Sequence, residues 1–255
     1  MKKLFSRESL KIIAMITMFI DHLGFVGLAG EYQVVFRIIG RIAFPIFAFQ
    51  LAEGFLHTKN RAKYILRVFI FAIISEIPYN MATLGRGISN PYAQNVLFTF
   101  TLSLLCMVCL EKLCKYDKID KGRFILDIII SIGILFVFHR LGAYAFVDYG
   151  GPGVILAPIL YLIRKHVVLN KALTSVLVTL SIVFVNYMLG SGLIIFVGNL
   201  MIGTQSFAAL SAVFIVGYIL TGGKSILHGK SGLALKITGY AFYPVHLFIL
   251  AIIAN

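Results

Sequence analysis

The sequence predicts an all-α fold, a polytopic transmembrane helical bundle of about nine spans. Three observations carry this prediction: 60% of the 255 residues are hydrophobic, only 13% are charged, and the mean hydropathy is +0.95. A soluble core of this size does not need so much apolar surface. The connections between the apolar runs are short, so residues 1–255 are predicted to form one integral membrane domain.

Nine apolar stretches of about bilayer length follow one another along the chain. The first resembles a signal sequence, but Asp21 and His22 occupy the place of a small-residue cleavage site, so we expect an uncleaved first span. In order, the predicted spans are 10–30, 33–56, 64–83, 96–114, 124–142, 152–164, 171–190, 205–221 and 236–254.

One further apolar segment, residues 191–203 (SGLIIFVGNLMIG), is only 13 residues long. A full crossing here would move the basic group at 224–236 to the other side of the membrane. We therefore expect a re-entrant or interfacial piece on the outer side. If the segment did cross, the chain would have ten spans and a cytoplasmic C-terminus.

The positive charges predict the orientation in the membrane. Nineteen of the 23 Lys and Arg residues fall on one side if the spans alternate, whereas the other side keeps Arg86 and Arg140, with Arg37 and Arg41 inside a span. Because short cytoplasmic loops are rich in Lys and Arg, we expect a cytoplasmic N-terminus. The same rule accounts for the net charge of +13 without a nucleic-acid partner. The basic groups lie at 2–11, 59–67, 112–123, 164–171 and 224–236.

Ionisable side chains inside the first two spans mark the candidate functional site. Asp21 and His22 are adjacent in the first, and Arg37 and Arg41 lie one helical turn apart in the second. Such groups are costly in hydrocarbon and commonly functional. Two guanidinium groups on one helix face suit a carboxylate, a phosphate or a developing oxyanion. The alternative is that both arginines are structural counter-ions of Asp21 and Glu76.

His22 is the candidate general base toward an amine or hydroxyl acceptor. Its neighbour Asp21 lies about 100° away around a helix and is poorly placed to orient the imidazole. We therefore expect a carboxylate from elsewhere, with Glu76 as the candidate, to orient it. The alternative is that His22 only forms a hydrogen bond between helices.

Two prolines bend predicted helices next to polar residues. Pro78 lies between Glu76 and Asn80, which share a helix face, and its kink either opens a polar cavity or only bends the helix. Pro244 precedes His246, which is either a second acid–base group or an interhelical hydrogen-bond partner.

The residues alone leave three classes of function open. One is an enzyme that uses the acid–base cluster. The second is an ion-coupled transporter or a lipid or precursor flippase, which needs the same residue types at membrane depth but is disfavoured by the lack of an internal repeat. The third is a noncatalytic membrane partner that helps to assemble a surface polymer or pilus. The sequence contains no nucleophile motif, no phosphate-binding glycine loop and no metal-ligand spacing, so no metal is expected.

Four sequence stretches carry a family resemblance that covers most of the chain. The most specific feature is a buried Asp-His pair followed by R-x2-G-R-x2-F-P-I-F. The four stretches are LKIIAMITMFIDHLGFVGL, FRIIGRIAFPIFAFQLAEGF, FAIISEIPYNMA and YAFYPVHLFIL. In them the chain resembles the TraX family, which takes its name from the conjugative pilin acetylase.

The resemblance implies an acyltransferase in a bacterial cytoplasmic membrane that passes an acetyl group from cytoplasmic acetyl-CoA to an acceptor outside. By this resemblance, His22 would match the catalytic histidine, Asp21 its acidic neighbour, and Arg37 and Arg41 the second-span arginines. From their own positions in the sequence, Glu76, Asn80 and His246 are expected to support the site.

The partners implied are the acyl-CoA donor, an extracytoplasmic acceptor such as a protein N-terminus, pilin, glycan or lipid, and membrane lipid. The oligomeric state, a homodimer included, stays open. We expect the donor's phosphates to bind near Lys59, Arg61 and Lys63.

Overall fold

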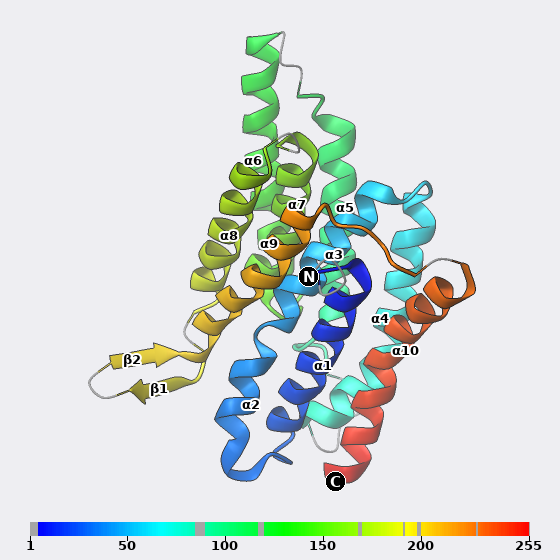
Figure 1. Cartoon of the computed structure of the whole chain (residues 1–255), viewed down its shortest axis with the longest axis vertical. Helices are drawn as coiled ribbons and strands as arrows, with labels where there is room; N and C mark the ends of the chain where they lie inside the picture. Colours follow the sequence, from blue (N-terminus) through cyan, green and yellow to red (C-terminus); the bar gives the residue numbers. More distant parts are fainter. Residues whose placement is uncertain are drawn as a thin grey trace.

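The computed structural model describes residues 5–84, 90–116, 120–167, 170–190, 192–197, 200–227 and 229–254. Most of this part of the chain is helical, and the helices lie side by side in a bundle (Figure 1). In chain order the elements are α1 (Arg7–Phe25), η1 (Gly30–Tyr32), α2 (Gln33–Gly40), α3 (Ala43–His57), α4 (Arg61–Leu84), α5 (Val96–Leu113), α6 (Lys121–Tyr144), α7 (Gly150–His166), α8 (Lys171–Met188), β1 (Ile194–Val197), β2 (Leu200–Gly203), η2 (Thr204–Leu210), α9 (Ser211–Thr221) and α10 (Gly229–Ala254).

Seven helical segments in the described residues are long and apolar enough to cross a membrane. The prediction of an all-α, multi-pass membrane protein is therefore confirmed, apart from one short hairpin, but the count of nine spans is not. The predicted spans 10–30 and 152–164 are helical, as α1 and α7. However, α1 carries Arg7, Glu8, Lys11 and Asp21, and α7 has only 17 residues. That length gives about 25 Å of helix against about 30 Å of hydrocarbon.

The basic connections meet at one end of the bundle, which we call the basic end. The backbone N–H of Arg7 donates to the carbonyl of Lys224 at 3.5 Å, which joins the start of α1 to the connection before α10 there. Arg61 and Lys165 both face the Glu111 carboxylate, at 2.5 and 3.9 Å. The gathering of these groups at one end agrees with alternating spans, while the side of the membrane that the end faces stays a prediction.

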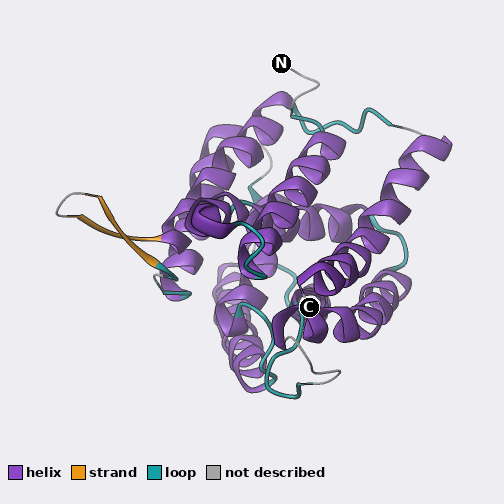
Figure 2. Ribbon diagram, turned by 90° about the horizontal axis from the view of Figure 1, so that it is seen from below, coloured by secondary structure: helices purple, strands orange, loops and turns teal. Residues whose placement is uncertain are grey.

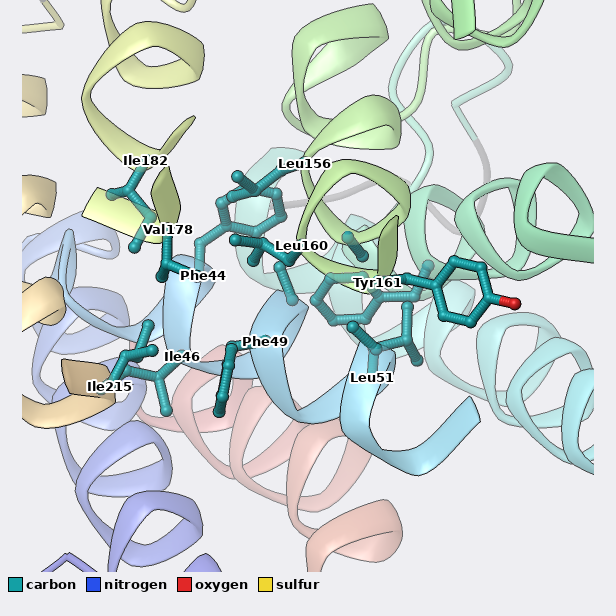
Figure 3. Packing of buried hydrophobic residues seen from close by; sticks show 14 of the residues in the cluster. Phe44, Ile46, Phe49, Leu51, Leu156, Leu160, Tyr161, Val178, Ile182 and Ile215 are labelled. Carbon is teal, nitrogen blue, oxygen red and sulfur yellow. The ribbon is translucent and has the colours of Figure 1, made fainter. Parts of the chain in front are cut away.

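The core lies where α3 packs against α7 in the middle of the bundle (Figure 3). Phe49 and Phe55 of α3 are fully buried, and the Phe55 ring stands edge-on to Tyr161 of α7 at a centroid distance of 5.2 Å. Leu156 and Leu160 add aliphatic contacts from α7. Because lipid is as apolar as these side chains, close van der Waals packing holds such helices together.

The outer helices expose large apolar side chains instead of burying them. On α6, Ile129, Ile132 and Phe136 are each 60% exposed or more. A soluble protein rarely exposes such a continuous apolar surface. This helix face is therefore suited to contact lipid.

The second apolar segment is broken into α2 and α3 at Arg41 and Ile42. The break has a local cause. Pro45 has no backbone N–H, so it cannot bond to the carbonyl of Arg41 four residues earlier, and the helix restarts with the proline in its first turn. The break leaves Arg41 at a helix end, directed toward α1.

The described residues within 192–203 form two strands and no helix. Strands β1 and β2 pair as an antiparallel hairpin, with Ile194 opposite Gly203 and Ile195 opposite Ile202, and the hairpin extends away from the helices (Figures 1 and 2). Four-residue strands are far too short to span a bilayer. A continuous apolar run lacks the periodicity that separates helix from strand, so the sequence did not reveal the hairpin.

Candidate active site

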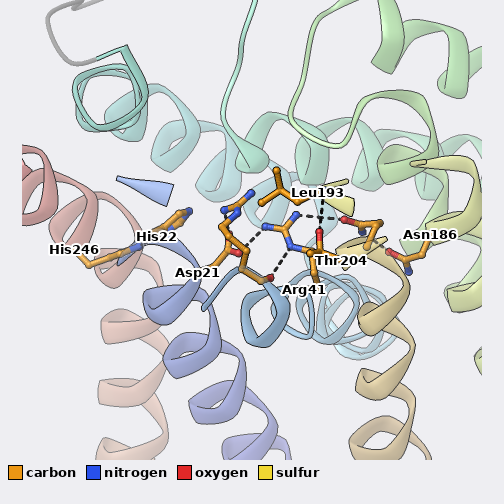
Figure 4. Close-up of polar contacts among 9 residues, drawn as sticks. Asp21, His22, Arg41, Asn186, Leu193, Thr204 and His246 are labelled. Carbon is orange, nitrogen blue, oxygen red and sulfur yellow. Dashed lines mark hydrogen bonds and ion pairs between the residues drawn. The ribbon is translucent and has the colours of Figure 1, made fainter. Parts of the chain in front are cut away.

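The carboxylate of Asp21 on α1 is held by both predicted arginines, and Figure 4 shows Arg41 beside it. Arg37 Nη1 donates to Oδ2 at 2.7 Å, and Arg41 Nη2 donates to Oδ1 at 2.6 Å. The Asp21 side chain is only 10% exposed. Both arginines are therefore ion-paired with Asp21, which agrees with one part of the alternative expectation, but neither pairs with Glu76. Asp148 is a second carboxylate beside the same cavities.

A glycine on α2 permits this approach between α1 and α2. A Cβ atom at Gly40 would overlap the Asp21 side chain, so the absence of a side chain at position 40 lets the carboxylate lie against the helix that carries Arg37 and Arg41. Nearer the end of α1, Gly24 faces Phe36 of α2 in the same way.

The variant Gly40→Ala is expected to destabilise the protein by about 1–3 kcal/mol, because the added methyl group overpacks the contact with Asp21. Gly133→Ala on α6 is the matched control, since a Cβ there meets open space. The control should be neutral or slightly stabilising because alanine favours helix. Unfolding in mixed detergent would compare the two, and equal stability of both variants would contradict the proposed contact.

His22 forms its closest polar contact with His246 of α10. The two side chains are 224 positions apart in sequence, yet His22 Nδ1 lies 2.7 Å from His246 Nε2. On its other side, His246 Nδ1 lies 2.6 Å from the carbonyl oxygen of Phe242. The rings of Phe19 and Tyr243 also contact His246 and fix its orientation.

These contacts determine where each neutral imidazole carries its proton. The Phe242 carbonyl can only accept, so His246 Nδ1 holds a proton and donates it. The Nε2 of a neutral His246 then accepts from His22 Nδ1. A neutral His22 consequently has its lone pair on Nε2, the atom that would take a proton from an acceptor.

Two polar residues that the sequence analysis did not select extend the cluster on the side of Arg41. Arg41 Nη1 donates to Gln205 Oε1 at 3.3 Å, and Gln205 Nε2 donates to Asn186 Oδ1 at 2.6 Å. Both amides are buried at the junction of α8 and η2. Asn186 had a signal in the sequence, a single amide in the otherwise apolar run 182–189, whereas Gln205 lies between Thr204 and Ser206.

Glu76 does not orient His22, contrary to our expectation. Its carboxylate accepts from Asn80 Nδ2 at 3.1 Å and from Asn95 Nδ2 at 2.5 Å, so it links α4 to the start of α5. His246 occupies the partner position at His22 Nδ1 instead. Glu76 and Asn80 thus form a separate polar contact on either side of Pro78 in α4.

The three predicted donor-binding residues lie at the basic end but line neither cavity described below. Arg61 is paired with Glu111, and its guanidinium also lies over the Phe55 ring at 4.9 Å. Lys59 and Lys63 are exposed.

Two cavities meet at the cluster. The larger, of about 620 Å³, extends from Arg7 and Lys11 at the basic end to His22. The smaller, of about 240 Å³, includes Arg37 and Arg41. Asp21, His22, Asp148 and Tyr149 line both cavities. His22 is therefore reachable from two directions.

Fold and site together define a multi-pass membrane protein with a buried acid–base cluster between α1, α2 and α10. The family model described as TraX protein matches residues 6–254, so the chain belongs to the TraX family and the resemblance is confirmed. It is also similar to a protein of Dichelobacter nodosus described as probable fimbrial assembly protein FimC, serogroup H1. The two are 26% identical over 265 residues, which cover 96% of this chain and 94% of that protein. No solved structure matches the chain.

Proposed function

We propose that the protein is a membrane-embedded acyltransferase that moves an acetyl group from acetyl-CoA to an amine or hydroxyl of an acceptor outside the cytoplasm. The observation that carries the proposal is the position of His22 between two cavities. A donor in the larger cavity and an acceptor in the smaller one would meet at this imidazole. Such a ternary complex needs no covalent enzyme intermediate. Membership of the TraX family, which is associated with pilin acetylation, supports the same reaction.

In the proposed reaction, His22 Nε2 takes the proton of the acceptor as its nitrogen or oxygen attacks the thioester carbonyl. A new bond from carbonyl carbon to the acceptor forms, and the carbon–sulfur bond breaks as the tetrahedral intermediate collapses. The thiolate of coenzyme A then takes the proton back from His22, so the enzyme returns unchanged. His246 acts as a positioning residue that holds His22 in the required tautomer.

Arg37 is the better of the two arginines for stabilising the oxyanion. All three nitrogens of Arg41 already donate, to Asp21, Gln205 and the carbonyl of Arg37. Among the described residues, Arg37 donates only through Nη1. Its remaining N–H groups are available for the developing negative charge, where a preorganised cation is most effective.

The variant His246→Leu is expected to lower kcat by about 10- to 100-fold, because His22 Nδ1–H loses its acceptor and the ring is free to turn. His246→Gln keeps an acceptor oxygen and should retain more activity. Initial rates and pH profiles of the two variants would check this. Equal loss in both variants, with an unchanged pH profile, would contradict the positioning role.

Mass spectrometry with isotope-labelled acetyl-CoA tests the proposed reaction. The purified protein in lipid nanodiscs would be incubated with the label and with separate peptide, glycan and lipid fractions of the bacterial surface. The proposal expects labelled acetyl in at least one fraction, and no label in any fraction contradicts it. Uptake of a solute by proteoliposomes without acetyl-CoA would favour a transporter.

A noncatalytic assembly role is the second candidate, because the similar protein from Dichelobacter nodosus is described as a probable fimbrial assembly protein. In that case a surface polymer subunit would bind to the chain in nanodiscs, and no labelled acetyl product would form. Acetylation of a fimbrial subunit would instead unite assembly and acyl transfer in one protein.

A further inference from the structure

Four basic side chains line the large cavity at the basic end. They come from three helices: Arg7 and Lys11 from α1, Arg67 from α4 and Lys236 from α10. We call them the cationic mouth. The helices that supply them include α1 and α10, which also carry His22 and His246.

Other basic residues at the same end have carboxylate partners. Arg164 lies 2.7 Å from Glu53, and Arg61 lies 2.5 Å from Glu111. By contrast, no carboxylate in the described part of the chain forms an ion pair with any member of the cationic mouth. Glu8, the one acidic residue near it in the cavity wall, accepts from the Ser225 hydroxyl and, at 2.9 Å, from the backbone N–H of Ile226. Four cations with one nearby carboxylate keep an excess of positive charge, so this arrangement suits an anionic ligand.

The central member, Arg67, is held in place without a charged partner. Its guanidinium carbon lies 5.4 Å from the ring centre of Tyr240 and 5.8 Å from that of Tyr64. A guanidinium group fixed between two rings and without a carboxylate partner is preorganised for a phosphate oxygen.

The distance from the cationic mouth to the histidine pair can be read from the helices. Lys11 precedes His22 by eleven residues of α1, which is about 16 Å of helix. Lys236 precedes His246 by ten residues of α10, which is about 15 Å. A ligand that occupies both positions must therefore carry its anionic group on a long, thin arm. The cavity volume of about 620 Å³ is within the usual range for a small-molecule site.

We infer that the cationic mouth binds the phosphate groups of a coenzyme A thioester, whose pantetheine arm then brings the thioester to His22. The inference rests on the proposed function and deepens it, because it assigns the donor's phosphates to Arg7, Lys11, Arg67 and Lys236. The expected site at Lys59, Arg61 and Lys63 lies outside this cavity.

Binding of adenosine 3′,5′-bisphosphate and of coenzyme A, measured by calorimetry on the protein in zwitterionic nanodiscs, tests the inference. The double variant Arg67→Gln/Lys236→Gln should weaken both ligands by about 10-fold or more, since two charge-assisted contacts are lost. Lys112→Gln/Lys115→Gln removes the same charge from exposed positions at the same end and should change binding by less than about 2-fold. Unliganded melting temperatures of both variants show whether each is folded.

The outcomes separate this inference from the proposed function. If nucleotide binding depends on Arg67 and Lys236 but no acyl transfer occurs, the assignment of the phosphate site stands and the proposed acyltransferase activity is contradicted. If the Arg67→Gln/Lys236→Gln variant transfers acetyl with an unchanged KM for the donor, the inference is wrong but the proposed function stands. The same conclusion follows if nucleotide binding is lost in Lys59→Gln/Lys63→Gln and not in Arg67→Gln/Lys236→Gln.

An anionic lipid headgroup offers the same phosphate chemistry. If phosphatidylglycerol nanodiscs stabilise the protein through Arg67 and Lys236 while adenosine 3′,5′-bisphosphate does not bind, the mouth is a lipid site and the inference is wrong.

Discussion

Replacing His22 with glutamine is expected to lower the rate of acetyl transfer by about 10²- to 10⁴-fold, the usual contribution of a general base. Glutamine preserves much of the size of the ring and a hydrogen bond to His246, but it cannot take a proton at neutral pH. The loss should appear in kcat, because His22 is proposed to act on the attacking atom and not to bind the donor. Release of free coenzyme A, followed with a thiol reagent, measures the rate.

The matched control for this prediction is His139→Gln. His139 lies on α6 and lines neither cavity, so its replacement should leave the rate within about 2-fold. If His22→Gln keeps the activity of the control, His22 is not the base and the proposed mechanism is wrong.

The second large effect concerns stability. Asp21→Asn removes the charge that two largely buried arginines share and leaves both cations without their ion-pair partner. We expect a loss of about 3–5 kcal/mol in the free energy of unfolding, the usual cost of breaking a buried ion pair by removing one partner. Denaturation of the protein in mixed detergent micelles, followed by circular dichroism, would measure it.

Glu111→Gln is the matched control, because Glu111 also pairs with an arginine at close range but has a side chain that is 30% exposed. Water screens this pair, so its loss should cost about 1 kcal/mol or less. Equal destabilisation by the two variants would mean that the Asp21 cluster is solvated, and this would contradict the account of a buried site.

Part of the site was predictable from local sequence because it depends on helical spacing. Arg37 and Arg41 are four residues apart, and four residues place two side chains on one helix face, where both reach Asp21. The cost of ionisable groups in hydrocarbon also made it predictable that these residues would find one another.

The contacts that were not predictable join helices far apart in the chain. The pairing of His22 with His246 depends on how α10 packs against α1, and hydropathy contains no information about which helices are neighbours. Because the sequence does not show which helices are neighbours, Glu76 was wrongly predicted to orient His22. For the same reason, Gln205 and the cationic mouth were not predicted. The β1–β2 hairpin was not predicted for a different reason, since a short apolar run predicts neither helix nor strand.

The most direct test of the central claim, that donor and acceptor reach His22 from opposite ends, is the sidedness of the reaction. The protein would be reconstituted in sealed vesicles sorted by orientation, with labelled acetyl-CoA on one side and the acceptor fraction on the other. The account predicts labelled product only when acetyl-CoA faces the basic end. Equal labelling from both sides, or labelling only with acetyl-CoA at the opposite end, would contradict it.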